Sequence, residues 1–293
     1  MQFHSAQSMI DYCLQNDIAL HECSLKSEVA LTGKSETEIL NYLADVLNVM
    51  FEAIEMGLSD ANPYHGKIIG EDGKKLKSRR ENRDPICGDV ISKAASYALS
   101  TMKVNAGMGR IVASPTAGSC GVLPAVLLSL KEKFNYTSEA LVNALLVANA
   151  VGSLVARNAT ISGAEGGCQA EVGTASAMAA AAAVYLDGGD IEEIFTSSAM
   201  AFKNLLGLVC DPIAGLVESP CAKRNAMGAS NALLCAEMAR SGIRSIVPFD
   251  EVVDAMYRIG RAMPAALRET SLGGLAITPT AIQISTDIFK KEI

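Results

Sequence analysis

The chain has 293 residues and a net charge of −7, from 25 Lys and Arg against 32 Asp and Glu. This balance lacks the positive footprint of a nucleic-acid-binding protein, so we expect no nucleic-acid partner. With 49% hydrophobic and 19% charged residues, the chain can bury a large core and is not intrinsically disordered as a whole. Its eight cysteines are spread along the chain and its first residues contain no stretch of signal-peptide type, which is typical of a reducing cytoplasm.

The first 60 residues show a helical pattern. Its clearest start is Ser35, which with Glu38 predicts a capping box ahead of apolar residues spaced three and four apart. Residues 60–88 are rich in turn residues and contain a basic run, so we expect an irregular polar segment there. The basic run is either a solvated face or a rim that attracts an anionic substrate or a partner chain. These changes indicate an N-terminal helical segment, 1–60, followed by a larger domain, 61–293, or one continuous domain, 1–293.

From residue 89 onward the chain consists of Ala-rich helical segments separated by short stretches of Gly, Pro and Ser. The expected helices cover 89–103, 121–133, 138–157, 170–186, 190–206, 222–240 and 249–262. No strand-length runs of Val, Ile and Thr alternate with them, so the fold class is predicted to be all-α, with closely packed helices. The apolar stretch 141–156 falls short of the ~20 residues that cross a bilayer, and we expect a buried core helix and no membrane partner.

The segment from Ser114 to Gly121 is a loop of Gly and small hydroxyl residues that leads into a predicted helix. The free N–H groups at such a helix start can hold a carboxylate or a phosphate. The alternative is a tight turn between helices, in which the Ser and Thr side chains only cap the helix. The segment is neither a P-loop nor a dinucleotide fingerprint, because no strand precedes it and it contains no Gly-Lys-Ser/Thr.

Three cysteines, Cys168, Cys210 and Cys221, lie at junctions of loop and helix that are rich in Gly and Pro. A thiolate at a helix start is favoured by the helix dipole and can serve as a metal ligand. Structural zinc commonly takes four ligands in tight Cys-x-x-Cys pairs, which are absent here. Three cysteines suit a 4Fe–4S cluster with one open iron, which is a Lewis acid. Spacing alone leaves both this cluster and a purely structural role of the cysteines open.

Four stretches carry a longer similarity. They are Ser-Pro-Thr-Ala-Gly-Ser-Cys-Gly at 114–121, Ser-Gly-Ala-Glu-Gly-Gly-Cys-Gln-Ala-Glu-Val-Gly at 162–173, Cys-Asp-Pro-Ile-Ala-Gly-Leu-Val-Glu-Ser-Pro-Cys at 210–221 with Arg-Asn-Ala-Met-Gly at 224–228, and Arg-Glu-Thr-Ser-Leu-Gly-Gly-Leu-Ala at 268–276. In this order they resemble the iron–sulfur-dependent L-serine dehydratases, over residues 60–280. The chain is similar to the alpha subunit of the two-chain form.

This resemblance implies an all-helical chain, a separate beta subunit that completes the active site, and L-serine as substrate. It implies that Cys168, Cys210 and Cys221 carry the 4Fe–4S cluster, whereas Cys120 does not. The expected reaction is elimination of water from L-serine to give pyruvate and ammonia, with the substrate hydroxyl on the open iron. The expected donors to the substrate carboxylate are Ser114, Thr116, Gly118, Ser119, Arg224 and Arg268. For the two arginines, ion pairs between helices are the alternative.

The candidate base for the α-proton is His65, because it lies in the irregular polar segment and histidine titrates near neutral pH. The alternatives are a surface turn histidine without a catalytic role and a base from the beta subunit. Glu165 and Glu171 flank Cys168, and each is expected to be a hydrogen-bond acceptor around the cluster or a base, the first role being favoured.

Three other functions stay in view. A pyridoxal-phosphate dehydratase needs a Schiff-base lysine in an α/β fold, a context that Lys93 and Lys103 do not have. A non-catalytic cluster carrier or iron sensor would bind the cluster without dehydratase activity. A related cluster-dependent lyase would act on cysteine and release sulfide.

Overall fold

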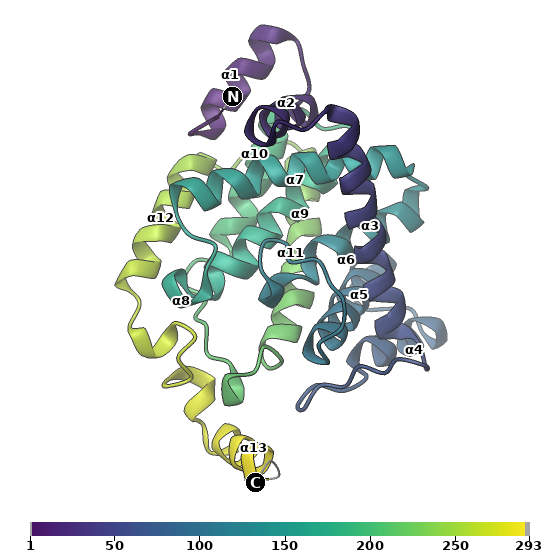
Figure 1. The fold of residues 1–293 in the computed structure, drawn as a ribbon, viewed down its shortest axis with the longest axis vertical. Helices are drawn as coiled ribbons and strands as arrows, with labels where there is room; N and C mark the ends of the chain where they lie inside the picture. Colours follow the sequence, from purple (N-terminus) through teal and green to yellow (C-terminus); the bar gives the residue numbers. More distant parts are fainter. Residues whose placement is uncertain (1, 291–293) are drawn as a thin grey trace.

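The computed structural model describes residues 2–290, and helices make up its architecture (Figure 1). The described residues contain no β-strand and only one isolated backbone bridge, between Cys210 and Arg268. The predicted all-α fold class is therefore confirmed. The α-helices are α1 Ala6–Asn16, α2 Leu20–Thr32, α3 Glu36–Leu58, α4 Asp72–Asn82, α5 Gly88–Ala106, α6 Val122–Phe134, α7 Ser138–Asn158, α8 Gly163–Gly166, α9 Thr174–Leu186, α10 Ile191–Lys203, α11 Cys221–Arg240, α12 Phe249–Ala262 and α13 Pro279–Lys290. The shorter turns are η1 Ala117–Ser119, η2 Gln169–Gly173, η3 Ile213–Gly215, η4 Ala265–Leu267 and η5 Gly274–Ile277.

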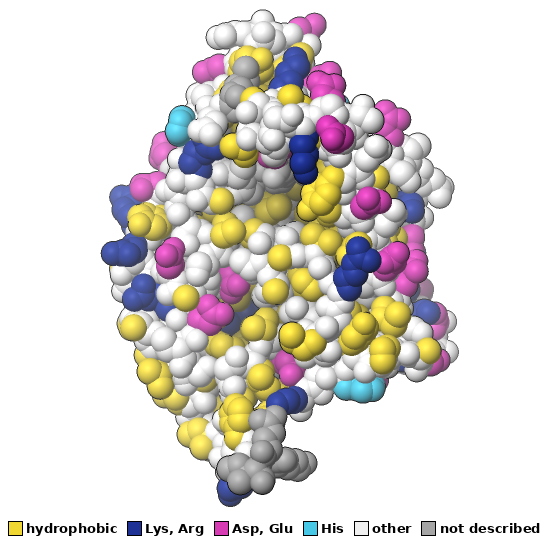
Figure 2. Space-filling view, in the orientation of Figure 1, with side chains coloured by type: hydrophobic (Ala, Val, Ile, Leu, Met, Phe, Trp, Pro, Cys, Tyr) yellow, Lys and Arg dark blue, Asp and Glu magenta, His cyan; other side chains and the backbone are white. Residues whose placement is uncertain are grey.

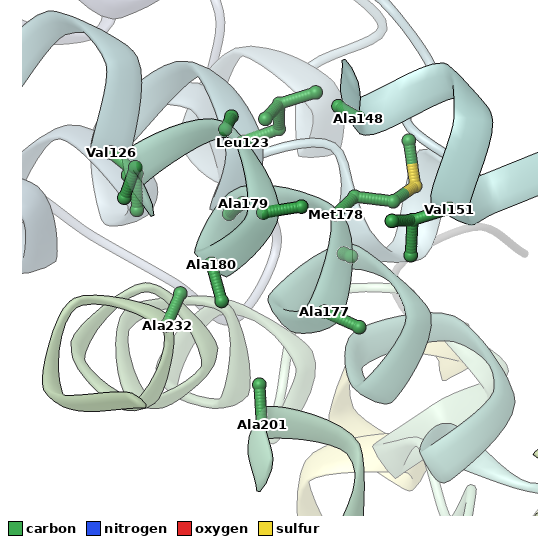
Figure 3. Packing of buried hydrophobic residues seen from close by; sticks show 14 of the residues in the cluster. Leu123, Val126, Ala148, Val151, Ala177, Met178, Ala179, Ala180, Ala201 and Ala232 are labelled. Atoms are coloured by element: carbon green, nitrogen blue, oxygen red, sulfur yellow. The ribbon is translucent and has the colours of Figure 1, made fainter. Parts of the chain in front are cut away.

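Helix α9 lies at the centre of the molecule, packed against α6, α7, α10 and α11 (Figure 1). Its residues Ala179 to Ala182 are fully buried, as are Ala201 of α10 and Ala232 of α11. Figure 3 shows Ala180 and Ala232 pointing toward each other across the α9–α11 contact. Side chains this small let neighbouring helix backbones approach closely. The predicted close packing of small residues is confirmed, and α9 lacks a polar face because helices enclose it.

The first 60 residues form three helices, and α3 packs against α5, α6 and α7. The Ser35 hydroxyl accepts the Glu38 N–H at 3.3 Å, and the Glu38 carboxylate accepts the Ser35 N–H at 2.8 Å, which confirms the capping box. Among the described residues, α7 is the one helix long and apolar enough to span a membrane, and it packs against α9 and α2.

The irregular segment predicted over 60–88 is wrong in its second half, because Asp72–Asn82 forms helix α4. Its Lys, Arg, Leu and Glu residues are good helix formers, but they lack the apolar stripe that a periodicity argument detects. The helix is fixed at Gly73, whose carbonyl oxygen accepts the Ser96 hydroxyl of α5 at 2.7 Å. Four basic side chains of α4 have carboxylate partners: Lys74 with Asp60 and Glu71, Lys75 with Asp72, Lys77 with Glu81, and Arg80 with Asp89. Figure 2 shows a similar mixture of acidic and basic side chains on the face that it views.

The segment after α12 runs beside the loop that carries Cys210. The Cys210 N–H donates to the Leu267 carbonyl oxygen at 2.9 Å, and the Glu269 N–H donates to the Cys210 carbonyl oxygen at 2.7 Å. Helix α13 then packs against η3 and η5, at the end of the molecule opposite α1 (Figure 1). The part of the chain after residue 262 therefore braces the Cys210 loop.

Candidate active site

The loop from Ser114 to Gly121 is held in place by one amide side chain. Asn225 of α11 donates from Nδ2 to the Gly118 carbonyl oxygen at 2.8 Å and accepts the Gly121 N–H at Oδ1 at 2.9 Å. Its Nδ2 also donates to the Cys221 carbonyl oxygen at 2.9 Å. Asn225 is fully buried, so these partners supply the hydrogen bonds that water cannot. Asn225 therefore fixes the position of the loop relative to the first turn of α11.

Glu171 lies where the three segments predicted to carry chemistry meet. It belongs to the π turn η2, an irregular turn of a kind often found at functional sites. Thr116 Oγ1 donates to its Oε1 at 2.7 Å, and Cys210 Sγ lies 3.9 Å from its Oε2. Burial raises the pKa of Glu171, the hydrogen bond from Thr116 lowers it, and the Glu269 carboxylate raises it. This carboxyl group, which holds its proton more tightly than usual, contacts both the loop and a candidate ligand.

Two glycines make room for the Glu171 carboxyl group. A Cβ atom at Gly118 would lie 2.9 Å from Oε1, and one at Gly163 would lie 2.5 Å from Oε2. Both distances are shorter than van der Waals contact, so any other residue at either position would displace the carboxyl group. The glycines at these two positions are therefore a packing requirement of the Glu171 carboxyl group.

The three candidate ligands are buried and lie in one neighbourhood. Cys168 directly precedes η2, Cys210 lies in the bridged segment, and Cys221 is the first residue of α11. The hydrogen bond that joins the thiols of Cys210 and Cys168 raises the pKa of Cys210, and burial raises it further. Burial, aided by the negative charges of Cys168 and Glu171, raises the pKa of Cys221 to about 12. The thiols of Cys210 and Cys221 therefore stay neutral unless a cation favours the thiolates.

The donor set distinguishes between kinds of metal group. Across residues 2–290, no three His, Cys, Asp or Glu side chains converge tightly enough to hold a single ion. A zinc ion lies about 2.3 Å from each thiolate sulfur, so its ligands meet at one point, whereas a cluster spreads its irons over a larger volume. Three buried thiols, two of them hydrogen-bonded to each other, fit a cluster that has one iron without a protein ligand.

The two arginines predicted to bind substrate have protein partners. Arg224 Nη2 pairs with Asp211 Oδ1 at 2.9 Å, and its Nη1 donates to the Val209 carbonyl oxygen at 2.8 Å. Arg268 Nη1 donates to the Glu165 carbonyl oxygen at 3.3 Å, while its Nε is buried without a hydrogen-bond partner among the described residues. Arg224 thus anchors the segment around Cys210, and Arg268 retains one donor atom for a ligand.

Comparison with known proteins identifies the family. A family model described as "Serine dehydratase alpha chain" matches residues 15–276. The chain belongs to the serine dehydratase alpha-chain family. It is 47% identical to the "Probable L-serine dehydratase, alpha chain" of Bacillus subtilis, over 98% of this chain and 95% of that protein. It is 43% identical to the "L-serine dehydratase, alpha chain" of Peptoniphilus asaccharolyticus, over 98% and 99%. The "L-serine dehydratase 2" of Escherichia coli is 39% identical over 94% of this chain, which spans 61% of that longer protein.

In this alpha-chain family member, the predicted substrate loop is shaped by its own hydroxyl groups. The Ser119 N–H donates to the Thr116 carbonyl oxygen at 3.2 Å, so this amide is used inside η1. The Ser119 and Thr116 hydroxyl oxygens lie 3.2 Å apart. Ser114 Oγ is buried and has no hydrogen-bond partner among the described residues. Ser114 therefore has a hydroxyl group without a protein partner, whereas the Thr116 hydroxyl is held by Glu171. The predicted role of Gly118 as a backbone donor remains a prediction.

His65 lies in an exposed position of the loop between α3 and α4. Its neighbours fasten this loop beside the site, because Ile69 packs in a small apolar cluster with Cys120, Cys221 and Met102. Burial raises the pKa of Cys120 to about 12, so this thiol stays neutral in the apolar cluster. The structure thus brings the His65 loop to the same side of the molecule as Cys221.

Two positioning residues were missed by the sequence reasoning. Asn225 and Gln169 both lie within the similar stretches, and the sequence assigns neither of them a role of its own. Gln169 is fully buried, donates from Nε2 to the Met256 carbonyl oxygen at 3.0 Å and accepts the Gly207 N–H at 2.9 Å. Gln169 directly follows Cys168, and Asn225 directly follows Arg224. The signal that could have found them is a polar amide near the start of an otherwise apolar helix.

Proposed function

We propose that this chain is the alpha subunit of an L-serine dehydratase that acts in the cytoplasm with a 4Fe–4S cluster. The observation that carries the proposal is the gathering of three buried thiols around Glu171, next to the loop that presents Ser114 and Thr116. The names of the alpha-chain relatives from Bacillus subtilis and Peptoniphilus asaccharolyticus support the same activity.

Cys168, Cys210 and Cys221 would hold the cluster as thiolates. When bound, a cluster with one iron that lacks a protein ligand supplies a Lewis acid for the substrate hydroxyl. The high pKa of free Cys221 and Cys210 implies that loading the cluster releases protons. The Glu171 carboxyl group, one hydrogen bond from Thr116, keeps the substrate loop in register with Cys210.

The protein residues orient L-serine and move its α-proton. Ser114 and the backbone of Gly118 would donate to the substrate carboxylate, with the Arg268 Nε as a further donor. Thr116 gives its hydroxyl proton to Glu171 and would shape the loop around the substrate. His65 would remove the α-proton while the Cβ–O bond breaks, and the departing hydroxide would take up one proton, so that water leaves. The product aminoacrylate tautomerises and is hydrolysed to pyruvate and ammonia without further help from the protein.

A partner subunit would complete this site. The chain spans 61% of the longer Escherichia coli relative, so that protein has a further region outside the match. We expect a separate beta subunit to supply the equivalent region, in line with the "alpha chain" names of the relatives of matching length. Turnover by the isolated chain should then be far below that of the mixture with the beta subunit.

The test is pyruvate formation from L-serine after anaerobic reconstitution with iron and sulfide, with the beta subunit present. Cys168→Ala, Cys210→Ala and Cys221→Ala should each lose the cluster absorbance and at least about a hundredfold in turnover, because a ligand is lost. Cys120→Ala is the matched control, since Cys120 is buried nearby but is not a proposed ligand, and it should keep both. Activity without iron, a cluster that persists in the three variants, or sulfide release from cysteine in place of pyruvate from serine would contradict the proposal.

A further inference from the structure

We infer that Glu218 is a positioning residue whose carboxylate fixes the His65 loop against the segment that ends in Cys221. The inference rests on the proposed function, in which His65 takes the α-proton. The Glu218 side chain acts through the backbone of residues 67–69.

The Glu218 carboxylate is buried and is satisfied by backbone amides. The side chain belongs to a residue that is 4% exposed. Its Oε1 accepts the Lys67 N–H at 2.9 Å, and its Oε2 accepts the Ile68 and Ile69 N–H groups at 2.7 and 3.0 Å. Burying a carboxylate is costly unless several donors compensate it, and successive backbone N–H groups form a concave anion site of the required kind. The loop conformation and the burial of this charge therefore depend on each other.

The residues on either side of His65 strengthen this attachment. A Cβ atom at Gly66 would lie 2.4 Å from Glu218 Oε2, so the backbone next to His65 touches the carboxylate. On the other side, Tyr64 packs on the end of α5, where a Cβ atom at Gly107 would lie 2.5 Å from the Tyr64 Cβ. His65 itself is exposed, so its place is set by these neighbours and not by contacts of its own ring.

Glu218 also belongs to the start of α11. Its carbonyl oxygen accepts the Ala222 N–H at 2.9 Å, which places it in the turn that presents Cys221. The same residue thus holds the His65 loop through its side chain and the Cys221 turn through its backbone. A displacement of about 1 Å between catalytic groups can reduce turnover by about a hundredfold, so a rigid link between these two segments has a direct effect on rate.

A double-mutant cycle on the reconstituted enzyme with its beta subunit tests the catalytic part. Glu218→Gln keeps the size of the side chain but replaces one acceptor oxygen by an NH₂ group that faces backbone donors. We expect kcat to fall about ten- to a hundredfold with KM changed less than about threefold. In the His65→Ala background, Glu218→Gln should cause no further loss, because a residue that acts through His65 has nothing left to position. Additive losses, or wild-type kcat in Glu218→Gln, would overturn the inference.

The turnover of the wild type and of His65→Ala distinguishes a wrong proposed function from a wrong role of Glu218. If the wild-type enzyme lacks cluster-dependent turnover, the proposed function fails. If the wild type turns over and His65→Ala is equally active, the base assignment is wrong and the inference falls with it. Gly66→Ala is a second variant in case Glu218→Gln folds poorly. It crowds the carboxylate from the loop side and should lower kcat in the same way, whereas unchanged kcat would count against the inference.

Hydrogen exchange gives a readout that does not depend on activity. In Glu218→Gln the amides of residues 67–69 should exchange at least about tenfold faster than in the wild type, since three hydrogen bonds are weakened. Asp250→Asn is the matched control, because the Asp250 carboxylate likewise accepts two backbone N–H groups, those of Ala6 and Gln7, at 2.8 and 3.3 Å. It should change exchange at the start of α1 and leave residues 67–69 and kcat unchanged. Equal exchange of residues 67–69 in wild type and Glu218→Gln would overturn the inference.

Discussion

At the residue scale, buried amide side chains fix the loops of the site through hydrogen bonds to backbone groups. Asn225 satisfies the Gly121 N–H and the carbonyl groups of Gly118 and Cys221 from inside the core. Replacing it by Ala leaves buried backbone groups without partners, at about 1–3 kcal/mol for each. We expect Asn225→Ala to lower the free energy of unfolding by at least about 2 kcal/mol, and to raise the KM for serine because the loop loses its anchor.

Chemical denaturation and steady-state kinetics on the same preparation check this prediction. Asn231→Ala is a suitable control, because Asn231 is also an amide of α11 but bonds to Ser176 and the Ala201 carbonyl oxygen in the core. It should lower stability without changing KM. A selective effect of Asn225→Ala on stability alone would mean that the loop does not bind substrate.

Residue type and spacing in the sequence identify the three cysteines as candidate ligands. They do not identify the ion-pair partners of the charged residues. Cys168, Cys210 and Cys221 stand out because each lies at a helix break, a local property. The role of Arg224 depends on Asp211, thirteen positions away, whose carboxylate turns into the same buried space. The sequence shows that an arginine is present, but it does not show which carboxylate pairs with its guanidinium group in the fold.

At the element scale, helix α4 depends on one close approach. A Cβ atom at Gly73 would lie 2.1 Å from Ser100 Oγ and 2.8 Å from the Ser96 carbonyl oxygen, both in α5. Gly73→Ala should therefore push α4 away from α5 and destabilise the chain by about 1–3 kcal/mol. Gly70→Ala is the control, because a Cβ there meets nothing within 4 Å. Thermal unfolding of both variants checks the prediction, and equal melting temperatures would contradict it.

Helix α2 gives the chain a histidine that resists protonation. Burial lowers the pKa of His21, and the neighbouring Glu22 opposes this only in part. The ring lies 5.2 Å from that of Tyr185, and its Nδ1 is buried without a hydrogen-bond partner among the described residues. The unfolded chain takes up a proton at His21 near pH 6.5, whereas the folded chain does so only at lower pH. Stability therefore falls as the pH drops below about 6.5.

His21→Phe should reduce this acid sensitivity while keeping the ring packed on Tyr185. We expect the fall in melting temperature between about pH 7 and pH 5 to be smaller in this variant than in the wild type. His4→Gln, at an exposed position, serves as the control and should follow the wild type. The same pH dependence in all three proteins would show that His21 is not responsible.

The helices that could be predicted are those with an apolar period or an Ala-rich core, and α3, α7 and α9 are examples. Helix α4 was missed because its stability comes from Gly73 and from ion pairs, which periodicity does not record. Helix α13 was missed because only Ala281 is buried in it, so its position follows from contacts with η3 and η5. The π turn at Glu171 was missed for a similar reason, since its shape depends on the segments that pack around it.

At the scale of the whole molecule, the site joins parts of the chain that are far apart in sequence. The Thr116 loop, the Cys168 turn, the Cys210 loop and the start of α11 meet around Glu171, while residues 267–269 brace Cys210 from outside. The helical core around α9 reaches the site directly, because Cys168 and Cys210 belong to the same buried cluster as the α9 alanines. A cluster held by Cys168, Cys210 and Cys221 would link the loops to one another.

A group that binds only the folded chain stabilises it by mass action, by about 2.7 kcal/mol at a hundredfold excess over Kd. For a chain of this size that corresponds to a rise in melting temperature of roughly 4–5 °C. Anaerobic removal of iron by a chelator should therefore lower the melting temperature of the reconstituted wild-type chain by about that amount. In Cys210→Ala the chelator should have no effect, whereas Cys120→Ala should respond like the wild type. A chelator effect of equal size in Cys210→Ala would mean that iron stabilises the chain at some other place.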